Sequence, residues 1–357
     1  MKTRYLVDVQ ELKRNCTRLH SYIQADRYFY AMKANAEERV LSALVLDGYG
    51  FEVASVEEFR RANKAPAHAD NVICGLPVKP REVITQLYRQ GVRYFVFDRL
   101  DELEKLNRDA PDARKIARLY VKDLDGESAE WGMPPDTILR LLEAGQEIDG
   151  LSFHIARNYQ VRHITHVMDR VEKVLSACNR PMIVNIGGGY RAELPAHLAL
   201  RYNLGEFYLR LAERLGQIKN HHTVEIYCEP GRGIIQSACH ILAEVVLADR
   251  ADDVYRVFLN MNIGSMTGSH PLHIKVMGDG EEECVYSAQW HMSQQAKEAG
   301  YMTAFIDTIC EYRPFFSLPL TRPVRHGEVL KLEGMGAYTF SQAYDFHCRE
   351  RIAYAEG

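Results

Sequence analysis

The sequence predicts an α/β fold, a (β/α)8 barrel followed by a mostly β C-terminal domain. Three observations lead to this prediction. Eight short apolar runs alternate with amphipathic stretches over about 200 residues. After about residue 240 this alternation gives way to short extended runs. The length of 357 residues suits about two domains.

Eight runs rich in β-branched and aromatic residues predict the barrel strands. They are Tyr28–Met32, Tyr49–Val53, Val72–Gly75, Tyr94–Phe97, Ile116–Val121, Gly150–Phe153, Ile183–Ile186 and Glu225–Cys228. Amphipathic stretches between them predict helices, among them Glu37–Leu46, Val56–Asn63, Arg81–Arg89 and Pro135–Glu143. Successive strand–helix units without a long gap favour a closed barrel, and an open doubly wound sheet is the alternative.

The C-terminal part predicts a β domain. Its extended runs are Cys239–Leu247, Tyr255–Leu259, His273–Met277, Glu283–Ser287 and Glu328–Glu333. Residues 1–9 also read as extended and could add a strand to this domain. We therefore expect a barrel over residues 10–240 and a β-rich domain built from residues 1–9 and 241–357.

Composition and charge argue against nucleic acids and membranes as binding partners. Hydrophobic residues make up 46% and charged residues 26% of the chain, as in an ordinary globular protein. A net charge of −4 provides no basic surface for nucleic acid or an anionic membrane. The sequence shows no apolar run of about 18 residues and no signal-peptide core. We expect a cytoplasmic protein that binds neither nucleic acid nor membranes.

Cysteine and histidine spacing does not point to a metal. The eight cysteines are scattered without a CxxC pair, which predicts neither a zinc site nor a disulfide framework. Most are expected to be buried packing residues. His221, His222 and His270 lack carboxylates or cysteines at ligand spacing and are interpreted as surface or core histidines.

Polar residues and glycines stand at the ends of five predicted strands. They are Lys33 in YAMKAN, Glu52 in FEVAS, His154 in LSFHIAR, Gly187-Gly188-Gly189 in NIGGGY, and Glu229-Pro230-Gly231-Arg232 in EPGR. The carboxyl ends of barrel strands meet at one mouth, where barrel enzymes carry out their chemistry. These residues are therefore expected to converge on one site.

Each of these residues also has a purely structural interpretation. Lys33 could be a solvated lysine, and His154 a hydrogen-bonded core histidine. The glycines could form only a tight turn, and Arg232 could pair with a surface carboxylate. Together, however, they meet the needs of pyridoxal phosphate: a lysine for a Schiff base, a glycine loop for the phosphate, and a carboxylate for the pyridine nitrogen.

Seven segments then resemble a known family, the fold-type III pyridoxal-phosphate decarboxylases, which include ornithine and diaminopimelate decarboxylases. The segments are YAMKAN, FEVASVEEF, SFHIAR, NIGGGY, EPGR, ICEYR and MGAYTFS. The resemblance spans nearly the whole chain. It implies the arrangement of barrel and β domain that alanine racemase and these decarboxylases share.

The resemblance implies a role for each matched residue on the barrel. Lys33 forms the Schiff base and His154 stacks on the cofactor ring. Glu229 pairs with the pyridine nitrogen, and Glu52 begins the acidic segment that follows the lysine motif. The cofactor contacts implied around the phosphate are Gly187, Gly188, Gly189, Gly231, Arg232 and Tyr338.

The resemblance also implies a head-to-tail homodimer with shared active sites. Cys310, Glu311 and Tyr338 would reach the cofactor of the other subunit. Cys310 would control the proton returned to the α-carbon, and Glu311 would contact the substrate. The β domain would then complete the active site across the dimer.

Three departures from the family pattern concern the substrate. Where the family often has glycine and serine after the stacking histidine, this chain has Ile155-Ala156-Arg157. Three interpretations of Arg157 stay open: it takes over an anion contact, it reaches a substrate carboxylate, or it is a plain surface residue. The segment NMNIGSMTGSHPLHI lacks the arginine of diaminopimelate enzymes. It has Met261 or Asn262 where ornithine enzymes place an aspartate. We expect a modified or extended biosynthetic substrate, such as a polyamine precursor, a siderophore intermediate or an aminocarboxypropyl group of a natural product.

Three alternatives accompany this expectation. One is an ornithine or diaminopimelate decarboxylase proper. A second is an amino-acid racemase on the same barrel, which Glu229 disfavours because such racemases avoid a strongly protonated ring nitrogen. A third is a non-catalytic, cofactor-binding regulatory homologue, which would be free to lose Lys33 or Cys310, yet both are present.

Overall fold

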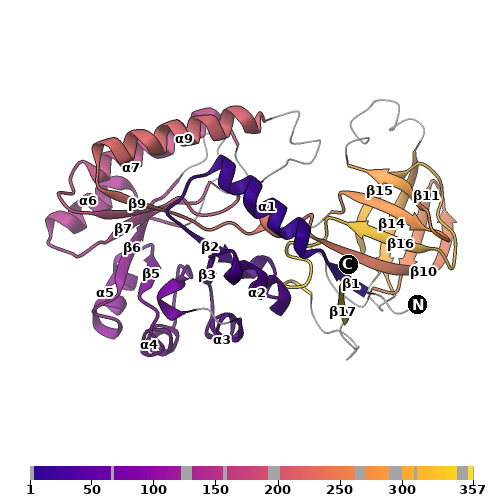
Figure 1. Cartoon of the computed structure of the whole chain (residues 1–357), viewed down its shortest axis with the longest axis horizontal. Coiled ribbons are helices and arrows are strands. Elements are labelled where there is room, and N and C mark those ends of the chain that lie inside the picture. Colours follow the sequence, from indigo (N-terminus) through magenta and orange to yellow (C-terminus); the bar gives the residue numbers. More distant parts are fainter. Residues whose placement is uncertain are drawn as a thin grey trace. The chain divides into compact units, whose positions relative to one another are not determined.

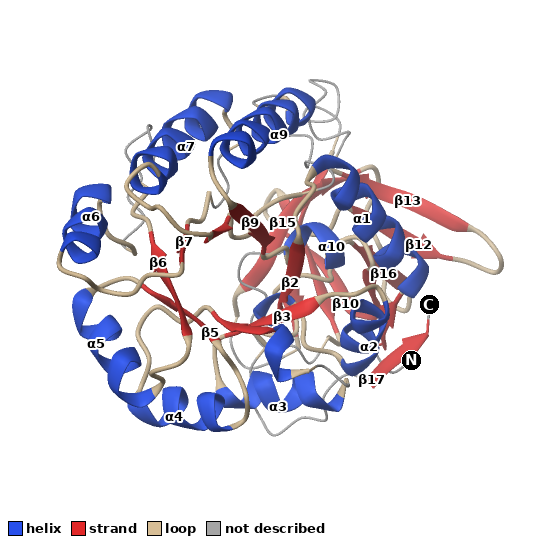
Figure 2. Cartoon of the chain, turned by 60° about the vertical axis from the view of Figure 1, so that its left-hand side comes forward, coloured by secondary structure: helices blue, strands red, loops and turns tan. Residues whose placement is uncertain are grey.

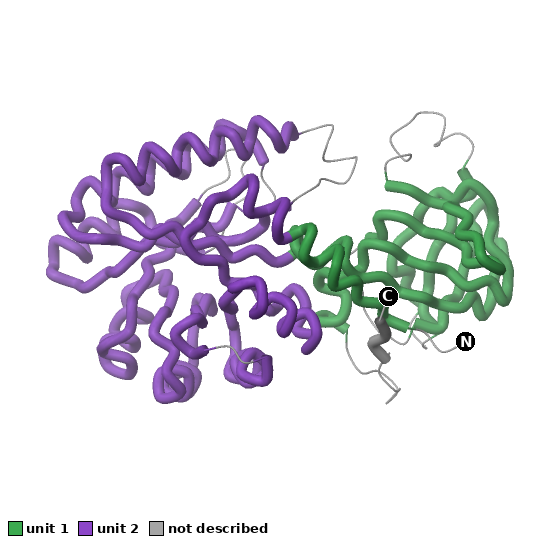
Figure 3. The backbone as a smooth tube through the Cα atoms, viewed as in Figure 1, with its two compact units in different colours: residues 1–15, 192–201, 232–357 green, residues 16–191, 202–231 purple. Residues whose placement is uncertain are grey.

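The computed structural model describes residues 4–65, 68–121, 131–155, 159–191, 202–261, 270–288, 300–308, 312–343 and 353–356. These residues fall into two compact units (Figure 3). One unit holds the described parts of Cys16–Arg191 and Tyr202–Gly231, and the other those of Met1–Asn15 and Arg232–Gly357.

The first unit is a closed parallel barrel, which confirms the barrel and excludes the open sheet. Its strands are β2 (Arg27–Ala31), β3 (Gly50–Val53), β4 (Val72–Cys74), β5 (Tyr94–Phe97), β6 (Arg114–Arg118), β7 (Gly150–Ser152), β8 (Met182–Asn185) and β9 (Val224–Cys228). Each strand pairs in parallel with the next, and β9 closes on β2 where Arg27 faces Tyr227.

Helices surround the ring of strands (Figure 2). They are α2 (Glu38–Leu46), α3 (Val56–Lys64), α4 (Arg81–Arg89), α5 (Leu100–Asp109), α6 (Pro135–Glu143), α7 (Val161–Leu175) and α9 (Leu204–His221), with short 3-10 turns η1 (Met32–Ala34) and η2 (Ala69–Asn71). Local sequence explains their ends: Ser55 caps α3 by accepting from the Glu58 amide, and the Glu58 carboxylate accepts from the amide of Ala54, one residue before the cap.

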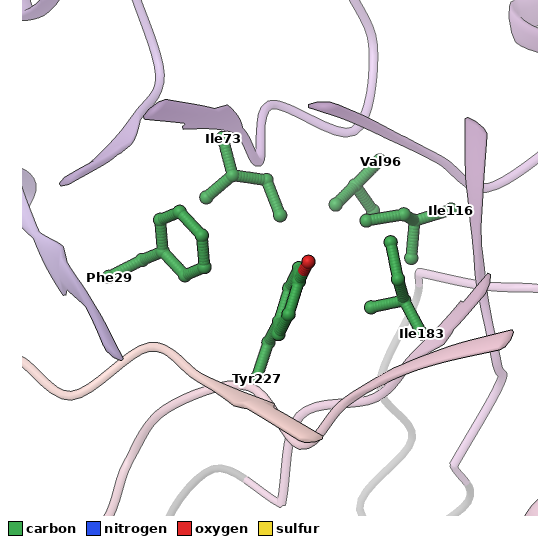
Figure 4. Packing of buried hydrophobic residues seen from close by; sticks show 6 residues of the cluster. All are labelled: Phe29, Ile73, Val96, Ile116, Ile183 and Tyr227. Atoms are coloured by element: carbon green, nitrogen blue, oxygen red, sulfur yellow. The ribbon is translucent and has the colours of Figure 1, made fainter. Parts of the chain in front are cut away.

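The barrel interior is packed with buried side chains that point toward one another (Figure 4). Six buried side chains from β2, β4, β5, β6, β8 and β9 fill it: Phe29, Ile73, Val96, Ile116, Ile183 and Tyr227. Because this layer fills the inside of the ring, ligand chemistry is confined to the strand ends.

The second unit is a β domain. Its strands are β1 (Arg4–Val7), β10 (Cys239–Ala251), β11 (Val254–Leu259), β12 (His273–Met277), β13 (Glu282–Ser287), β14 (Tyr301–Asp307), β15 (Pro314–Leu320), β16 (Val329–Glu333) and β17 (Ala353–Glu356), and it also contains the short helix α10 (Arg232–Ile235). Along the sheet the order is β13-β12-β16-β10-β11-β14-β15. β1 pairs with β10 and lies beside β17 (Figure 1), so the N-terminal residues do add a strand to this domain.

The structure differs from the sequence expectation at one helix and three strands. The long helix α1 (Val9–Tyr22) already begins at Val9, which was expected to be extended. The strands β14, β15 and β17 were not predicted. Pro314 and Pro319 lower the strand signal of β15, but it ends the described sheet order, where missing N–H donors are tolerated.

Candidate active site

Lys33 meets a buried acidic partner at the end of its strand. It lies in η1, directly after β2, and its Nζ is 2.6 Å from Oε2 of Glu52 on β3. The Lys33 side chain is 45% exposed, whereas that of Glu52 is 3% exposed. The amine is therefore both accessible and held by a carboxylate, and it is not the unpartnered solvated lysine of the structural interpretation.

Glu229 is held from the neighbouring strand. Asn185, the last residue of β8, donates from Nδ2 to Oε1 of Glu229 at 2.6 Å. The Asn185 Oδ1 accepts from the Gly187 amide at 2.9 Å, and the Gly187 carbonyl accepts from the Glu229 amide at 2.8 Å. One asparagine thus ties the glutamate to the glycine loop.

The glycine loop packs directly on the backbone around it. Gly187 has φ +65°, and a Cβ there would lie 2.1 Å from the Phe153 carbonyl oxygen. A Cβ on Gly188 would lie 2.3 Å from the Glu229 carbonyl oxygen, and Gly189 has φ +96°. The absence of side chains is thus required by packing, and it leaves the loop backbone as the inner surface of the site.

His154 follows β7 and turns one ring nitrogen toward this loop. The Gly188 amide donates to its Nδ1 at 3.1 Å. Because a backbone N–H can only donate, Nδ1 carries no proton. Burial lowers the pKa of His154 to about 3, and the positive charges of Lys33 and Arg118 act in the same direction. The imidazole is therefore neutral at physiological pH.

The acidic groups influence one another. Burial is the main cause that raises the pKa of Glu229 above its usual value, and the charge of Glu52 raises it further. Lys33, the Asn185 hydrogen bond and Arg118 oppose that rise. A buried carboxyl group with a raised pKa beside an accessible amine is typical of a catalytic site.

The structure adds Arg118 and Asn185 to the site. Arg118 ends β6, and burial lowers the pKa of its guanidinium despite the nearby carboxylates of Glu229, Asp98 and Glu52. Both residues are the last of their strands. The predicted strands run on to Val121 and Ile186, so neither residue stands at a predicted strand end, although the strand-end rule finds both once the strands end where they do here.

Arg232 and Tyr338 form a pair of their own within the β domain unit. The Arg232 guanidinium lies 4.7 Å from the centre of the Tyr338 ring. Tyr338 has φ +62°, and the segment before it packs on α10, where the Gly336 amide donates to the Gln236 carbonyl at 3.0 Å. This contact groups Tyr338 with Arg232 of its own chain, and the cofactor that Tyr338 reaches stays a prediction.

The structure describes only some of the remaining candidate site residues. Gly231 packs closely on β2 and η1, since a Cβ there would lie 3.2 Å from those of Ala31 and Ala34. Met261 is fully buried after β11. Four other candidates lie outside the described residues: Arg157, Asn262, Cys310 and Glu311.

The described ranges contain no group of side chains that could hold a metal ion and no helix that could span a membrane. Within them, no three His, Cys, Asp or Glu side chains gather in a way that could hold a metal ion. His222 instead places Nε2 2.8 Å from Oε1 of Glu172. Over the same ranges, no helix combines the length and apolar character needed to cross a membrane.

Known proteins resemble this chain over most of its length. The model of the pyridoxal-binding domain of pyridoxal-dependent decarboxylases matches residues 9–236. The chain is 26% identical to ornithine decarboxylase of Neurospora crassa, over 97% of this chain and 78% of that protein. It is 28% identical to diaminopimelate decarboxylase of Deinococcus radiodurans, over 98% and 88% of the two chains.

Solved structures show the same fold. The arginine decarboxylase of Paramecium bursaria Chlorella virus superposes with a TM-score of 0.82 at 18% identity, over 100% of this chain and 96% of that chain. Barrel and β domain therefore occur together in an enzyme with little sequence in common.

Proposed function

The chain belongs to the family of pyridoxal-dependent decarboxylases, and we propose that it removes carbon dioxide from a modified or extended amino acid at the mouth that holds Lys33. The enzyme is a carboxy-lyase that uses pyridoxal 5'-phosphate. The observation that carries the proposal for its residues is the accessible Lys33 amine, held by buried Glu52 and electrostatically coupled to buried Glu229.

The residues of the mouth fit this cofactor. Bound pyridoxal phosphate supplies an electron sink for the electron pair left at the α-carbon when carbon dioxide departs. Lys33 offers an exposed primary amine for covalent attachment. The glycine loop offers backbone without side chains, as close approach of a phosphate requires.

Glu229 and His154 are proposed to bind the ring. Glu229 holds a proton at the pyridine nitrogen, and its buried position strengthens that charge interaction. His154 is neutral, and the Gly188 amide fixes its orientation, so it offers an uncharged flat face. Glu52 orients the Lys33 ammonium and is placed to take its proton when the amine reacts.

Arg232 and Tyr338 are proposed to bind the phosphate together. A guanidinium suits a phosphate in two-point fashion, and the Tyr338 ring holds it from one side. Since Arg232 directly follows Glu229-Pro230-Gly231 in the chain, we assign both residues to the cofactor of their own subunit. Gly231 contributes by letting this segment pack against β2 and η1.

Three further residues enter the proposal from the sequence alone: Cys310, Glu311 and Arg157. Cys310 controls protonation of the α-carbon, while Glu311 and Arg157 contact the substrate, in a homodimer that shares its active sites. The domain limits at residues 10 and 240 and the cytoplasmic location likewise remain predictions.

The segment after β11 supports an unusual substrate. The buried Met261 carries no charge that could hold a distal ammonium or carboxylate. An amino acid whose side chain is conjugated or extended suits this position better than free ornithine or diaminopimelate does. Those two substrates remain the alternatives within the family.

Incubation of the purified enzyme with a panel of candidate amino acids tests the function. We expect carbon dioxide release and a product lighter than its substrate by the mass of CO2, with conjugated substrates preferred. Loss of optical rotation without CO2 would identify a racemase, and no turnover of any family substrate would favour the regulatory homologue. Lys33→Ala should abolish the absorbance band of lysine-bound cofactor. Lys173→Ala is the control and should retain the band, because the exposed Lys173 side chain on α7 pairs with Asp136.

A further inference from the structure

Asn185 makes two hydrogen bonds whose directions fix its side-chain amide. Its side chain is fully buried at the end of β8. The Gly187 backbone N–H can only donate, so the atom that faces it at 2.9 Å must be the acceptor Oδ1. The donor Nδ2 therefore faces Glu229, at 2.6 Å from Oε1.

An amide at this position has a definite electrostatic effect. An N–H donor stabilises the ionised form of a carboxylate, and it occupies one oxygen so that the other is free for a second partner. The other titratable or charged groups that act on Glu229 are Glu52, Lys33 and Arg118, together with Cys228 and Tyr190 beside it. Of these, Lys33 and Arg118 favour the ionised form and Glu52 opposes it.

We propose that Asn185 is a positioning residue that holds Glu229 ionised and oriented toward the pyridine nitrogen, and that couples this carboxylate to the glycine loop. The inference rests on the proposed role of Glu229. A single side chain then sets the spacing between the contact for the ring nitrogen and the backbone that receives the phosphate. A displacement of either one is transmitted to the other through two hydrogen bonds.

Asn185→Asp separates the two contacts. The substitution keeps an acceptor for the Gly187 amide but places a second carboxylate against Glu229. Two carboxylates at hydrogen-bond distance cannot both ionise readily, so one proton is retained to higher pH. We expect infrared titration of the cofactor-free protein to show a carboxyl proton lost about one pH unit or more higher than in the wild type.

The cofactor-loaded Asn185→Asp enzyme should show the same change in its catalysis. We expect kcat to fall about tenfold at neutral pH with KM little changed, because the contact acts on the reacting state. An unchanged carboxyl titration together with unchanged kcat would overturn the proposal. Asn185→Ala, which also loses the Gly187 contact, should additionally weaken cofactor binding.

The double variant Asn185→Asp/Glu229→Gln reverses donor and acceptor in the pair. The amide introduced at position 229 can donate to the carboxylate introduced at position 185, so the melting temperature of the cofactor-free protein should recover relative to Asn185→Asp alone. No recovery would overturn the coupling of these two side chains. Recovery with Glu229→Gln alone fully active would support the coupling but refute the proposed role of Glu229, which keeps the two failures distinct.

Discussion

The Glu52 side chain occupies space that is open because a glycine, Gly75, follows the neighbouring strand β4. A Cβ on Gly75, directly after β4, would lie 2.3 Å from Oε1 of Glu52 and 2.9 Å from its Cδ. The colliding atoms belong to the end of a side chain and not to backbone. A side chain at position 75 would therefore displace the Glu52 carboxylate, which holds Lys33, without disrupting the strand.

Gly75→Ala is accordingly expected to alter the site and leave the fold intact. Displacement of Glu52 removes the 2.6 Å contact to the Lys33 amine. We expect the rate of cofactor attachment to Lys33, followed by absorbance, to fall about tenfold, since one charge-assisted hydrogen bond is lost. Circular dichroism should show a melting temperature close to that of the wild type. A normal attachment rate would mean that Glu52 does not prepare the amine.

Gly188→Ala should have the opposite profile, because its Cβ would meet backbone. The Glu229 carbonyl oxygen lies 2.3 Å from that position and cannot move without β9. We expect a loss of about 1–3 kcal/mol in the free energy of unfolding, as for other overpacked sites. Gly216→Ala in α9 is the matched control, since its Cβ meets nothing within 4 Å, and it should stabilise slightly. Equal effects of both substitutions would contradict this explanation.

At the residue scale, the sequence predicts most of the described site. Lys33, Glu52, His154 and Glu229 follow from the strand-end rule because each is a chemically distinctive residue beside an apolar run. Asn185 is not recognised in this way, because the predicted strand runs on to Ile186. An asparagine before glycines indicates a turn equally well, and its significance lies in two hydrogen bonds that only the closed barrel creates.

At the scale of elements, the β domain contains a face with two lysines directly opposite each other. Lys275 on β12 pairs in register with Lys331 on β16. Like charges in such positions destabilise a sheet unless they are compensated. Glu282 contacts the two lysines at 2.9 and 3.1 Å, and Glu333 contacts them at 2.9 and 3.2 Å. The four side chains form one alternating network.

Because of this network, the free energy of unfolding of the domain depends on pH in the acidic range. The hydrogen bond from Lys275 is the main cause that lowers the pKa of Glu282. Burial alone would raise the pKa of Glu333, but Lys275 and Lys331 lower it overall. Since both folded-state values lie below those of the unfolded chain, the stabilisation is complete above about pH 4.5 and is lost as the pH falls through the folded values.

Glu282→Gln is expected to remove part of this stabilisation. Because the pair is partly solvated, we expect a loss of about 0.5–1 kcal/mol at pH 7 that shrinks toward zero in acid. Denaturant unfolding at a series of pH values measures it. The adjacent exposed Glu281→Gln serves as the control and should be silent. A difference between Glu282→Gln and wild type that stays constant down to pH 3 would rule out the ion pairs as its cause.

The helices and strands differ in how well the sequence predicts them. The eight barrel strands are found within a few residues of their ends, because parallel strands buried on both faces read as short continuous apolar runs. β15 is different: Pro314 and Pro319 interrupt its pattern, and only its place at the end of the described sheet order makes the prolines acceptable.

At the scale of the whole molecule, the proposed dimer can be tested by mixing inactive variants. Lys33→Ala and Cys310→Ala disable different proposed contributions to one site. If Cys310 acts on the partner's cofactor, each heterodimer regains one native site, so random mixing should restore about a quarter of wild-type activity. Native mass spectrometry verifies that heterodimers form. Inactive heterodimers would refute the shared site.

The Arg232–Tyr338 contact supplies the control for that experiment. If Tyr338 serves the cofactor of its own subunit, Lys33→Ala mixed with Tyr338→Phe leaves every site with at least one defect. This mixture should therefore show no gain over Tyr338→Phe alone. A gain comparable to the first mixture would return Tyr338 to the partner's site.

The pairing of β1 with β10 has a consequence for biosynthesis on the ribosome. β1 precedes every barrel strand in the chain and therefore leaves the exit tunnel before them, yet its antiparallel partner β10 emerges only after every barrel strand has been translated. The barrel strands are contiguous in time, so the nascent chain can complete them while β1 waits unpaired. During that interval β1 is an exposed strand edge that a chaperone could shield, and the β domain is committed to fold last.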